Sequence, residues 1–163
     1  MALAPSNIPT APEPIIVVNA PLPQRPPDEP LTFLQPDEMQ WRKIIPSMGE
    51  NSPKMAVLRH VPQTGATTLL IWTPPNFHVP RHWHSGNEKH MVVSGTFIME
   101  CEGKRVVMKA GTYNYMPARM VHQAWTPPDD QCLLLTDVDT LWDVHWIDPP
   151  PSEPPAPSEA TTV

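Results

Sequence analysis

Residues 79–95 read VPRHWHSGNEKHMVVSG and contain three of the seven histidines of the chain. On a β-strand, residues two apart point to the same face, so His82 and His84 are expected to converge. The Ser-Gly-Asn sequence at 85–87 is typical of a turn, after which Glu88 on the returning strand can face the same side. Two imidazoles and a carboxylate across a tight turn could hold a divalent metal ion with positions left for water or substrate, and from these residues alone the alternative of ordinary polar side chains on a strand stays open.

One further ligand is expected from a distant strand, and His122 is the best placed because it lies in a β-rich run after Pro117. His90 lies two residues after Glu88 and is expected to point into the same interior. Two interpretations of His90 stay open: a core histidine bonded to a neighbour, or a base, proton relay or substitute ligand beside the metal. The remaining histidines lack matching partners and are interpreted as structural: His60, His78 and His145.

Short β-rich runs alternate with turn signals through the middle of the chain. The runs are Met55–His60, Thr67–Thr73, His90–Ser94, Thr96–Cys101, Arg105–Lys109, Thr112–Met116, His122–Thr126, Leu133–Val138 and Trp142–Ile147. Strands this short, separated by Gly, Pro and Asn, predict an all-β fold, either a sandwich or a barrel. The pattern alone does not distinguish the two architectures.

Prolines are concentrated at the two ends of the chain. Of 25 prolines, ten lie within the first 36 residues and six within the last 15. Because proline lacks an N–H donor and fixes φ, residues 1–54 are predicted to form an arm and residues 149–163 a disordered tail. The folded domain is therefore expected over residues 55–148. Within the arm, Ile15–Val18 is an apolar β-branched run that could add a strand to a sheet edge.

The charge balance bears on whether the protein binds nucleic acid or a membrane, and the cysteines bear on the redox state of its compartment. The formal charge is −6, from 11 Lys and Arg against 17 Asp and Glu, which gives no basic footprint for nucleic acid or an anionic membrane. The apolar runs are too short to span a bilayer. The N-terminus lacks the segments of a secretory signal, so the protein is expected to be cytoplasmic unless a leader was removed. Cys101 and Cys132 have no CxxC spacing and are expected to be free thiols, which fits a reducing compartment.

The histidine and glycine spacings together resemble the two motifs of the cupin superfamily. The first motif is Gly, five residues, His-x-His, three or four residues, Glu, six residues and Gly, matched here by His82, His84, Glu88 and Gly95. The second is Gly, five residues, Pro-x-Gly, two residues, His, three residues and Asn, matched by Gly111, Pro117 and His122. The resemblance covers roughly residues 73–148. It implies a single cupin barrel (a double-stranded β-helix or jelly roll) holding one divalent metal ion on His82, His84, Glu88 and His122.

Three positions depart from the cupin motifs, and none of them removes a ligand. Asn76 stands at the first glycine, and Asn tolerates left-handed turns better than most residues. Arg119 replaces the glycine of Pro-x-Gly, which leaves the geometry of that turn open and places a cation three residues from His122. Thr126 replaces the terminal Asn, which is a variable position.

Apolar and aromatic residues beside the expected ligands suggest a pocket and an outer contact surface. Val92, Met120 and Ala124 are expected to share the inward face with the ligands and to line the pocket. Tyr113 and Tyr115 share one face, and whether it points inward toward substrate or outward is open. The outward tryptophans, Trp83 and Trp125, are expected to pack a dimer interface or a covering arm.

The resemblance implies a metal-dependent enzyme whose substrate is a small molecule. The leading hypothesis is an oxidoreductase of dioxygenase type acting on a small oxygenated or aromatic compound, with Fe²⁺ as the expected ion and Mn²⁺, Zn²⁺, Ni²⁺ or Cu²⁺ as alternatives. A non-redox isomerase, lyase or dehydratase and a non-catalytic ligand-binding cupin stay open. The candidate catalytic residues are His90, Tyr115 and Arg119. A homodimer is expected.

Overall fold

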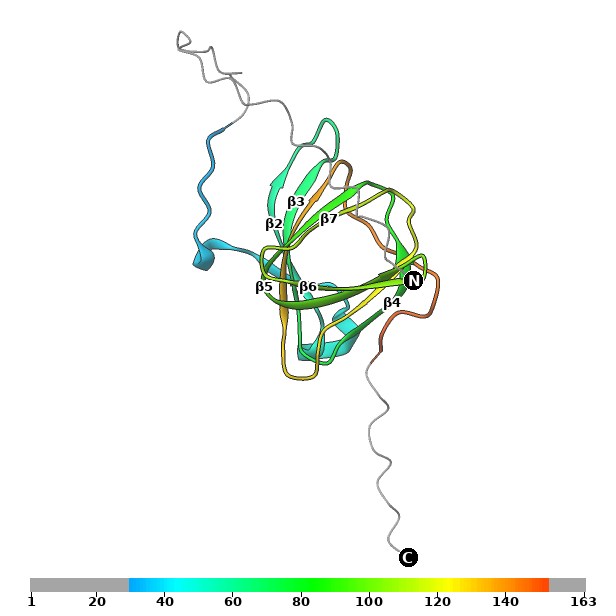
Figure 1. Cartoon of the computed structure of the whole chain (residues 1–163). Coiled ribbons are helices and arrows are strands. Elements are labelled where there is room, and N and C mark those ends of the chain that lie inside the picture. The colour runs from blue at the N-terminus through cyan, green and yellow to red at the C-terminus, as the bar shows by residue number, and fades with distance from the viewer. Residues whose placement is uncertain (1–29, 153–163) are drawn as a thin grey trace, which may run out of the picture. The chain divides into compact units, whose positions relative to one another are not determined.

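The computed structural model describes residues 30–152 (Figure 1). The unit that begins at Leu34 is built from β-strands and two short 3-10 helices, Pro36–Glu38 and Pro46–Asn51, so the all-β prediction is confirmed. The strands are β1 (Trp41–Lys43), β2 (Lys54–His60), β3 (Thr67–Thr73), β4 (His78–Trp83), β5 (Glu88–Cys101), β6 (Lys104–Lys109), β7 (Tyr113–Met116), β8 (His122–Trp125), β9 (Cys132–Val138) and β10 (His145–Trp146). They curl around a common interior, as a cupin barrel does (Figure 1). The predicted edge strand at Ile15–Val18 lies outside the described residues.

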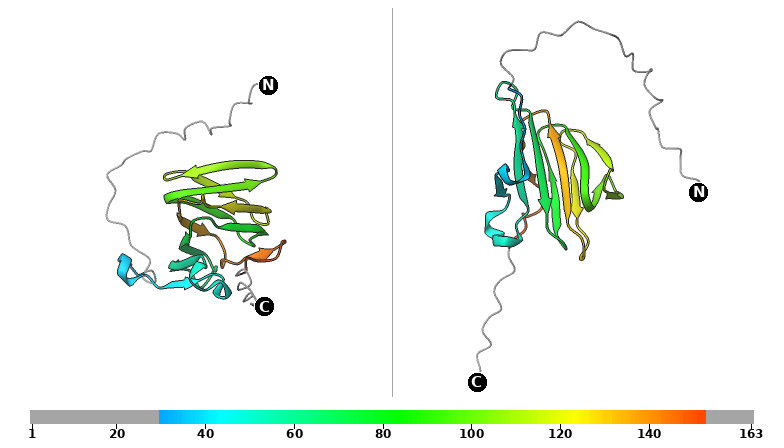
Figure 2. Two further views of the ribbon diagram at one scale, coloured as in Figure 1. Left: turned by 90° about the horizontal axis from the view of Figure 1, so that it is seen from below. Right: turned by 90° about the vertical axis from the view of Figure 1, so that its left-hand side faces the viewer.

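Two antiparallel sheets share the long strand β5. The first sheet has the order β1-β2-β3-β9-β5-β7, and the second has the order β10-β4-β8-β5-β6. The first half of β5 pairs with β9 and β7, whereas its second half pairs with β8 and β6. Figure 2 shows the neighbouring strands β2, β3 and β9 side by side in the first sheet. The barrel interior therefore lies between two sheets joined through one strand.

Gly95 marks the point at which β5 passes from one sheet to the other. Its φ of 76° lies in the left-handed region, and a Cβ there would lie 1.7 Å from the carbonyl oxygen of Gln131. Glycine alone fits because both the backbone angle and the approach of β9 exclude a side chain. The sequence predicts two strands separated at this glycine, and the structure has a single strand that bends there.

The alternation of side chains along β5 and β9 separates the core from the outer surface. On β9 every second residue from Cys132 to Val138 is buried. The buried core comprises Val92, Phe97, Met99, Met108, Met116, Ala124, Cys132 and Leu134. Both cysteines are free thiols, as expected. Because side chains two apart share a face, the inward set of β5 also includes Glu88 and His90.

The folded part begins earlier than the predicted boundary at residue 55, because β1 pairs with β2 and extends the first sheet. The sequence does not predict this three-residue strand, because it lies in the proline-rich segment that is assigned to the arm. The predicted strand Trp142–Ile147 is much shorter than expected, since only His145–Trp146 pairs with β4. Within residues 30–152, no helix is long and apolar enough to cross a membrane.

Candidate metal centre

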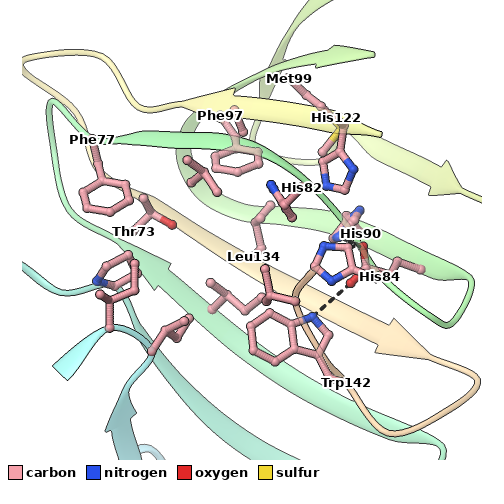
Figure 3. Close-up of a pocket in the computed structure, with 18 of the residues that line it drawn as sticks. Thr73, Phe77, His82, His84, His90, Phe97, Met99, His122, Leu134 and Trp142 are labelled. Atoms are coloured by element: carbon pink, nitrogen blue, oxygen red, sulfur yellow. Dashed lines mark hydrogen bonds and ion pairs between the residues drawn. The ribbon is translucent and has the colours of Figure 1, made fainter. Parts of the chain in front are cut away.

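Three histidines from two neighbouring strands converge at one end of the barrel interior (Figure 3). β4 pairs with β8 so that His82 lies opposite His122, and His84 follows directly after β4. All three side chains are buried, and their ligating atoms lie within 4.8 Å of one another. The predicted convergence of these residues is confirmed by this geometry.

Each of the three imidazoles is held by a backbone carbonyl at Nδ1. His82 donates to the carbonyl oxygen of Pro80 at 2.7 Å, and His122 donates to that of Met120 at 2.9 Å. His84 donates to the carbonyl oxygen of Asp143. Since a carbonyl only accepts hydrogen bonds, Nδ1 must carry the proton and Nε2 keeps its lone pair. This is the tautomer that binds a metal through Nε2, with the ring orientation already fixed.

His90 presents a fourth imidazole to the same pocket. β5 pairs with β7 so that His90 lies opposite Asn114, and its Nδ1 is 2.8 Å from the side-chain oxygen of that residue. Its Nε2 is left facing the carboxylate of Glu88, with Oε2 at 3.5 Å. His90 therefore bonds to a neighbour, as the first interpretation expects, and it also lines the pocket.

Glu88 is buried beside the histidines but lies outside the cluster that they form. It is 1% exposed, and its Oε2 lies 3.3 Å from Nε2 of His84. Among the described residues Oε2 accepts no hydrogen bond, because the imidazole nitrogens that face it carry lone pairs. A buried carboxylate oxygen without a donor, facing two lone-pair nitrogens, is the arrangement that a cation would satisfy. The residues present therefore fit a divalent metal ion.

Burial controls the charge state of the centre in the absence of an ion. It lowers the pKa of His82 to about 3, assisted by His122 and His84, and the pKa of His84 to about 4. Burial likewise lowers the pKa of His90 to about 4 and that of His122. Burial raises the pKa of Glu88 to about 8, against the opposing effect of its hydrogen bond with Trp142. The imidazoles are therefore neutral at pH 7, as metal ligands must be.

Two predicted catalytic residues, Tyr115 and Arg119, are not among the residues that line the pocket. Tyr115 lies opposite Lys89 in the β5–β7 register and is 51% exposed, with its hydroxyl donating to Asn87 at 3.2 Å. The residues of β5 that face inward are paired with Met116 and Asn114 instead. The inward and outward alternation of side chains could not be followed from His122 back across Pro117 in the sequence, so the sequence left the orientation of Tyr115 open.

Arg119 is exposed, and its backbone contacts the site. Its φ of 63° lies in the left-handed region, where the cupin motif has glycine. The turn is thereby kept, and the N–H of Arg119 donates to the carbonyl oxygen of His84 at 2.8 Å. Asn76, at the other substituted glycine, has a φ of 53°. Both residues therefore adopt the left-handed conformation that glycine adopts most readily.

That the segment after β9 reaches the centre could not be predicted from strand periodicity or from the motifs. Trp142 donates its indole N–H to Oε1 of Glu88 at 3.0 Å, and its ring lies 5.8 Å from that of His84 (Figure 3). The ring of Trp146 lies 5.3 Å from that of His82. The only signal was a pair of tryptophans four residues apart after the last long strand. The outward-facing Trp83 is covered by His145 of the same segment, with ring centroids 3.8 Å apart.

The centre lies at one end of a pocket with mostly apolar walls. Figure 3 shows the histidines at one end and Phe77 and Thr73 at the other, with Phe97 and Leu134 between them. Part of the wall comes from Ile44, Ile45 and Pro53, which the sequence assigns to the arm. The cavity measures about 70 Å³, well below the roughly 300–1,000 Å³ of pockets that hold drug-sized ligands. A ligand enclosed here must be small.

A β-barrel with histidines converging from β4 and β8 in its interior has the architecture of the cupin superfamily. The chain belongs more particularly to the family described as the ChrR cupin-like domain, whose sequence profile matches residues 30–141. Among curated proteins, none matches the sequence significantly.

Solved cupin structures resemble the chain in fold at low sequence identity. The polyketide cyclase RemF from Streptomyces resistomycificus is 16% identical with a TM-score of 0.61, over 72% of this chain and 86% of that one. A predicted oxalate decarboxylase from Thermotoga maritima is 20% identical with a TM-score of 0.58, over 68% and 100%. An RmlC-like cupin protein from Ralstonia eutropha is 20% identical with a TM-score of 0.57, over 67% and 68%. These likenesses establish the fold, and they include proteins named as enzymes of different reaction types.

Proposed function

We propose that this protein is a metal-dependent oxidoreductase of dioxygenase type that acts on a small oxygenated or aromatic compound. The observation that carries the proposal is the clustering of three neutral imidazoles, beside a buried carboxylate, at the end of a small apolar pocket. His82, His84 and His122 would hold the ion, with Glu88 as the adjacent anionic donor. A cytoplasmic location with reducing conditions, which keep Fe²⁺ available, belongs to the same proposal.

A divalent ion at this position would supply a Lewis acid and, as Fe²⁺, a centre for reaction with O₂. The chain contributes the conditions for that chemistry. The backbone carbonyls keep the three Nε2 atoms unprotonated and aimed into the pocket. Apolar walls such as Phe97 and Leu134 exclude water, which strengthens electrostatic interactions with a bound substrate.

His90 and Glu88 are the groups placed to hold or move a proton at the substrate. The Nε2 atom of His90 has a lone pair and faces the pocket, so it can accept a proton from a substrate hydroxyl. Oε2 of Glu88 lies 3.5 Å from this nitrogen. Tyr115 and Arg119 take no part in the proposed chemistry, because their side chains lie outside the pocket.

The proposal is tested by screening Fe²⁺-loaded protein against small diketones, hydroxyketones and catechols for oxygen consumption. The product of any reacting compound is then formed under ¹⁸O₂ and analysed by mass spectrometry. Incorporation of both labelled atoms supports the dioxygenase. Turnover of a compound without labelled oxygen, continuing under nitrogen with Zn²⁺, would replace it with a non-redox isomerase, lyase or dehydratase.

A further inference from the structure

Residues 139–146 lie beside the pocket and supply three of its lining residues, Trp142, Val144 and Trp146, and we call them the covering segment. It is fastened at its start by Asp139, whose carboxylate accepts hydrogen bonds from the backbone N–H of Asn87 at 2.9 Å and from its side-chain amide at 2.5 Å. Further on, the side chain of Asp143 accepts from the backbone N–H of Ser85 at 2.8 Å. The covering segment is thereby tied to the turn that joins β4 and β5, which lies between the histidine pair and Glu88.

The close approach of the covering segment to that turn depends on a glycine. A Cβ on Gly86 would lie 2.4 Å from Oγ1 of Thr140 and 2.9 Å from a carboxylate oxygen of Asp139. The absence of a side chain lets the covering segment lie directly against the turn. Trp142 lies beyond residue 141, where the match to the family ends.

Trp142 contacts both a ligand histidine and the carboxylate. The indole N–H donates to Oε1 of Glu88 at 3.0 Å, while the ring lies against His84 at an interplanar angle of 26°. An indole N–H is only a donor, and here its acceptor is the carboxylate. The lone pairs on Nε2 of the imidazoles therefore stay available. With Oε1 held, the carboxylate has one orientation, and its other oxygen faces the Nε2 atoms of His84 and His90 at 3.3 and 3.5 Å.

We propose that Trp142 is a positioning residue of the metal centre, whose indole N–H holds Oε1 of Glu88 so that Oε2 is presented to the ion. The inference rests on the metal site of the proposed function and on none of its oxygen chemistry. Partners that orient metal ligands typically contribute about 10- to 100-fold to metal affinity. Here the oriented ligand is a carboxylate, and the orienting group comes from the covering segment.

The test compares Trp142→Phe with Trp146→Phe in the full-length protein, using Co²⁺ as the probe. Both changes replace an indole that lies against a ligand histidine with a smaller ring. Only Trp142 loses a hydrogen bond, because within the described residues the indole N–H of Trp146 has no acceptor. Trp142→Phe is expected to weaken Co²⁺ binding about 10-fold or more and to change the visible absorption of the Co²⁺ form. Trp146→Phe is expected to leave both close to wild type.

A double-mutant cycle shows whether Trp142 acts through Glu88 or through general packing. Glu88→Leu replaces a buried carboxylate with an apolar side chain of similar size, which a buried apolar site tolerates. In that background Trp142→Phe should cost no further metal affinity, because no oxygen remains to be positioned. Cu²⁺, which binds nitrogen ligands more tightly, replaces Co²⁺ if the affinity of the Glu88→Leu protein is too low to measure.

The outcomes separate this inference from the proposed function. Wild-type protein that binds no Co²⁺ would overturn the metal centre itself. Equal losses for Trp142→Phe and Trp146→Phe, or a loss for Trp142→Phe that persists in the Glu88→Leu background, would overturn the positioning role and leave the metal centre standing. A loss confined to Trp142→Phe and abolished by Glu88→Leu supports it, whatever the substrate proves to be.

Discussion

Each clustered histidine uses one ring nitrogen for the fold and leaves the other for a ligand. For His82 and His122 the carbonyl that fixes the ring lies only two residues earlier on the chain, so strand geometry itself selects the tautomer. His84 has its acceptor 59 residues away, at Asp143. The first two ring orientations are therefore local, whereas that of His84 depends on the covering segment.

His84→Ala is expected to abolish stoichiometric binding of a divalent metal, because it removes one of three nitrogens that converge within 4.8 Å. His60→Ala is the matched control, since His60 is exposed on β2, away from the pocket, with Oγ1 of Thr67 at 3.5 Å from its Nδ1. Metal content after dialysis against Zn²⁺, measured by plasma emission, checks the prediction. An equal loss of metal in the two variants would contradict the choice of ligands.

The metal-free protein is expected to lose stability as the pH falls from about 6.5 to 4. The pKa values of His82, His84 and His90 are lowered to about 3, 4 and 4, whereas an unfolded histidine titrates near 6.5. The unfolded chain therefore binds protons in this window that the folded chain excludes, and the free energy of unfolding falls by about 1.4 kcal/mol per pH unit for each net proton.

Glu88 opposes this trend, because its raised pKa of about 8 means that the folded chain binds a proton more readily than the unfolded chain. Glu88 is one group against four histidines with lowered pKa values, so the histidines determine the sign of the change in stability. Urea unfolding in the presence of EDTA at pH 7, 6, 5 and 4 measures the effect. A urea midpoint that does not change between pH 6.5 and 4 would show that burial does not keep the imidazoles unprotonated.

At the scale of single elements, β5 depends on the bend at its middle. Gly95→Ala is expected to destabilise the protein by about 3–5 kcal/mol, from left-handed strain together with overpacking against β9. Gly103, in the turn after β5, is the control: its φ is also positive, at 73°, but nothing lies within 4 Å of a Cβ built there. Gly103→Ala should therefore cost only about 1–2 kcal/mol. Chemical denaturation of both variants measures the difference, and equal costs would contradict the close approach to Gln131.

Elements governed by local periodicity could be predicted from the sequence. The boundaries of β3 are the predicted ones, and the histidine ligands follow from two-residue spacing and the spacing of the motifs. β1 could not be found, because a three-residue strand forms only when a partner edge is available. Trp142 could not be assigned either, since its contact with Glu88 depends on how the chain returns after β9. A contact that forms because the chain folds back after a strand leaves no pattern in the sequence, whereas the alternation of side chains along a strand does.

At the scale of the whole folded unit, the first sheet has a row of apolar residues whose exposed members are Trp41, Met91 and Tyr113, while Ala56 is fully buried. The register places these residues side by side across six strands: Trp41, Ala56, Leu70, Leu135, Met91 and Tyr113. Met91 and Tyr113 are 44% and 57% exposed. A second copy presents the same row, so two copies related by a two-fold axis can bury it against itself.

The predicted homodimer is therefore expected to form through this face. Met91→Lys places a charge in the middle of the apolar row and should convert the dimer to a monomer. Val107→Lys is the control, because Val107 is exposed on β6 of the other sheet. Sedimentation velocity at several concentrations distinguishes the two states. A wild-type monomer, or a dimer that Met91→Lys leaves intact, would contradict this assignment.

The strand shared by the two sheets also affects how the centre exchanges its contents. β5 bears Glu88 and His90 and forms ladders with four other strands, so it cannot detach without breaking both sheets. Local opening that exposes the ligands through the wall of the barrel would then cost nearly the free energy of global unfolding. We therefore expect an ion or substrate to reach the centre at an end of the barrel rather than through its wall, and the covering segment, whose Trp142 lies beside His84 and Glu88, to influence how fast the centre is loaded.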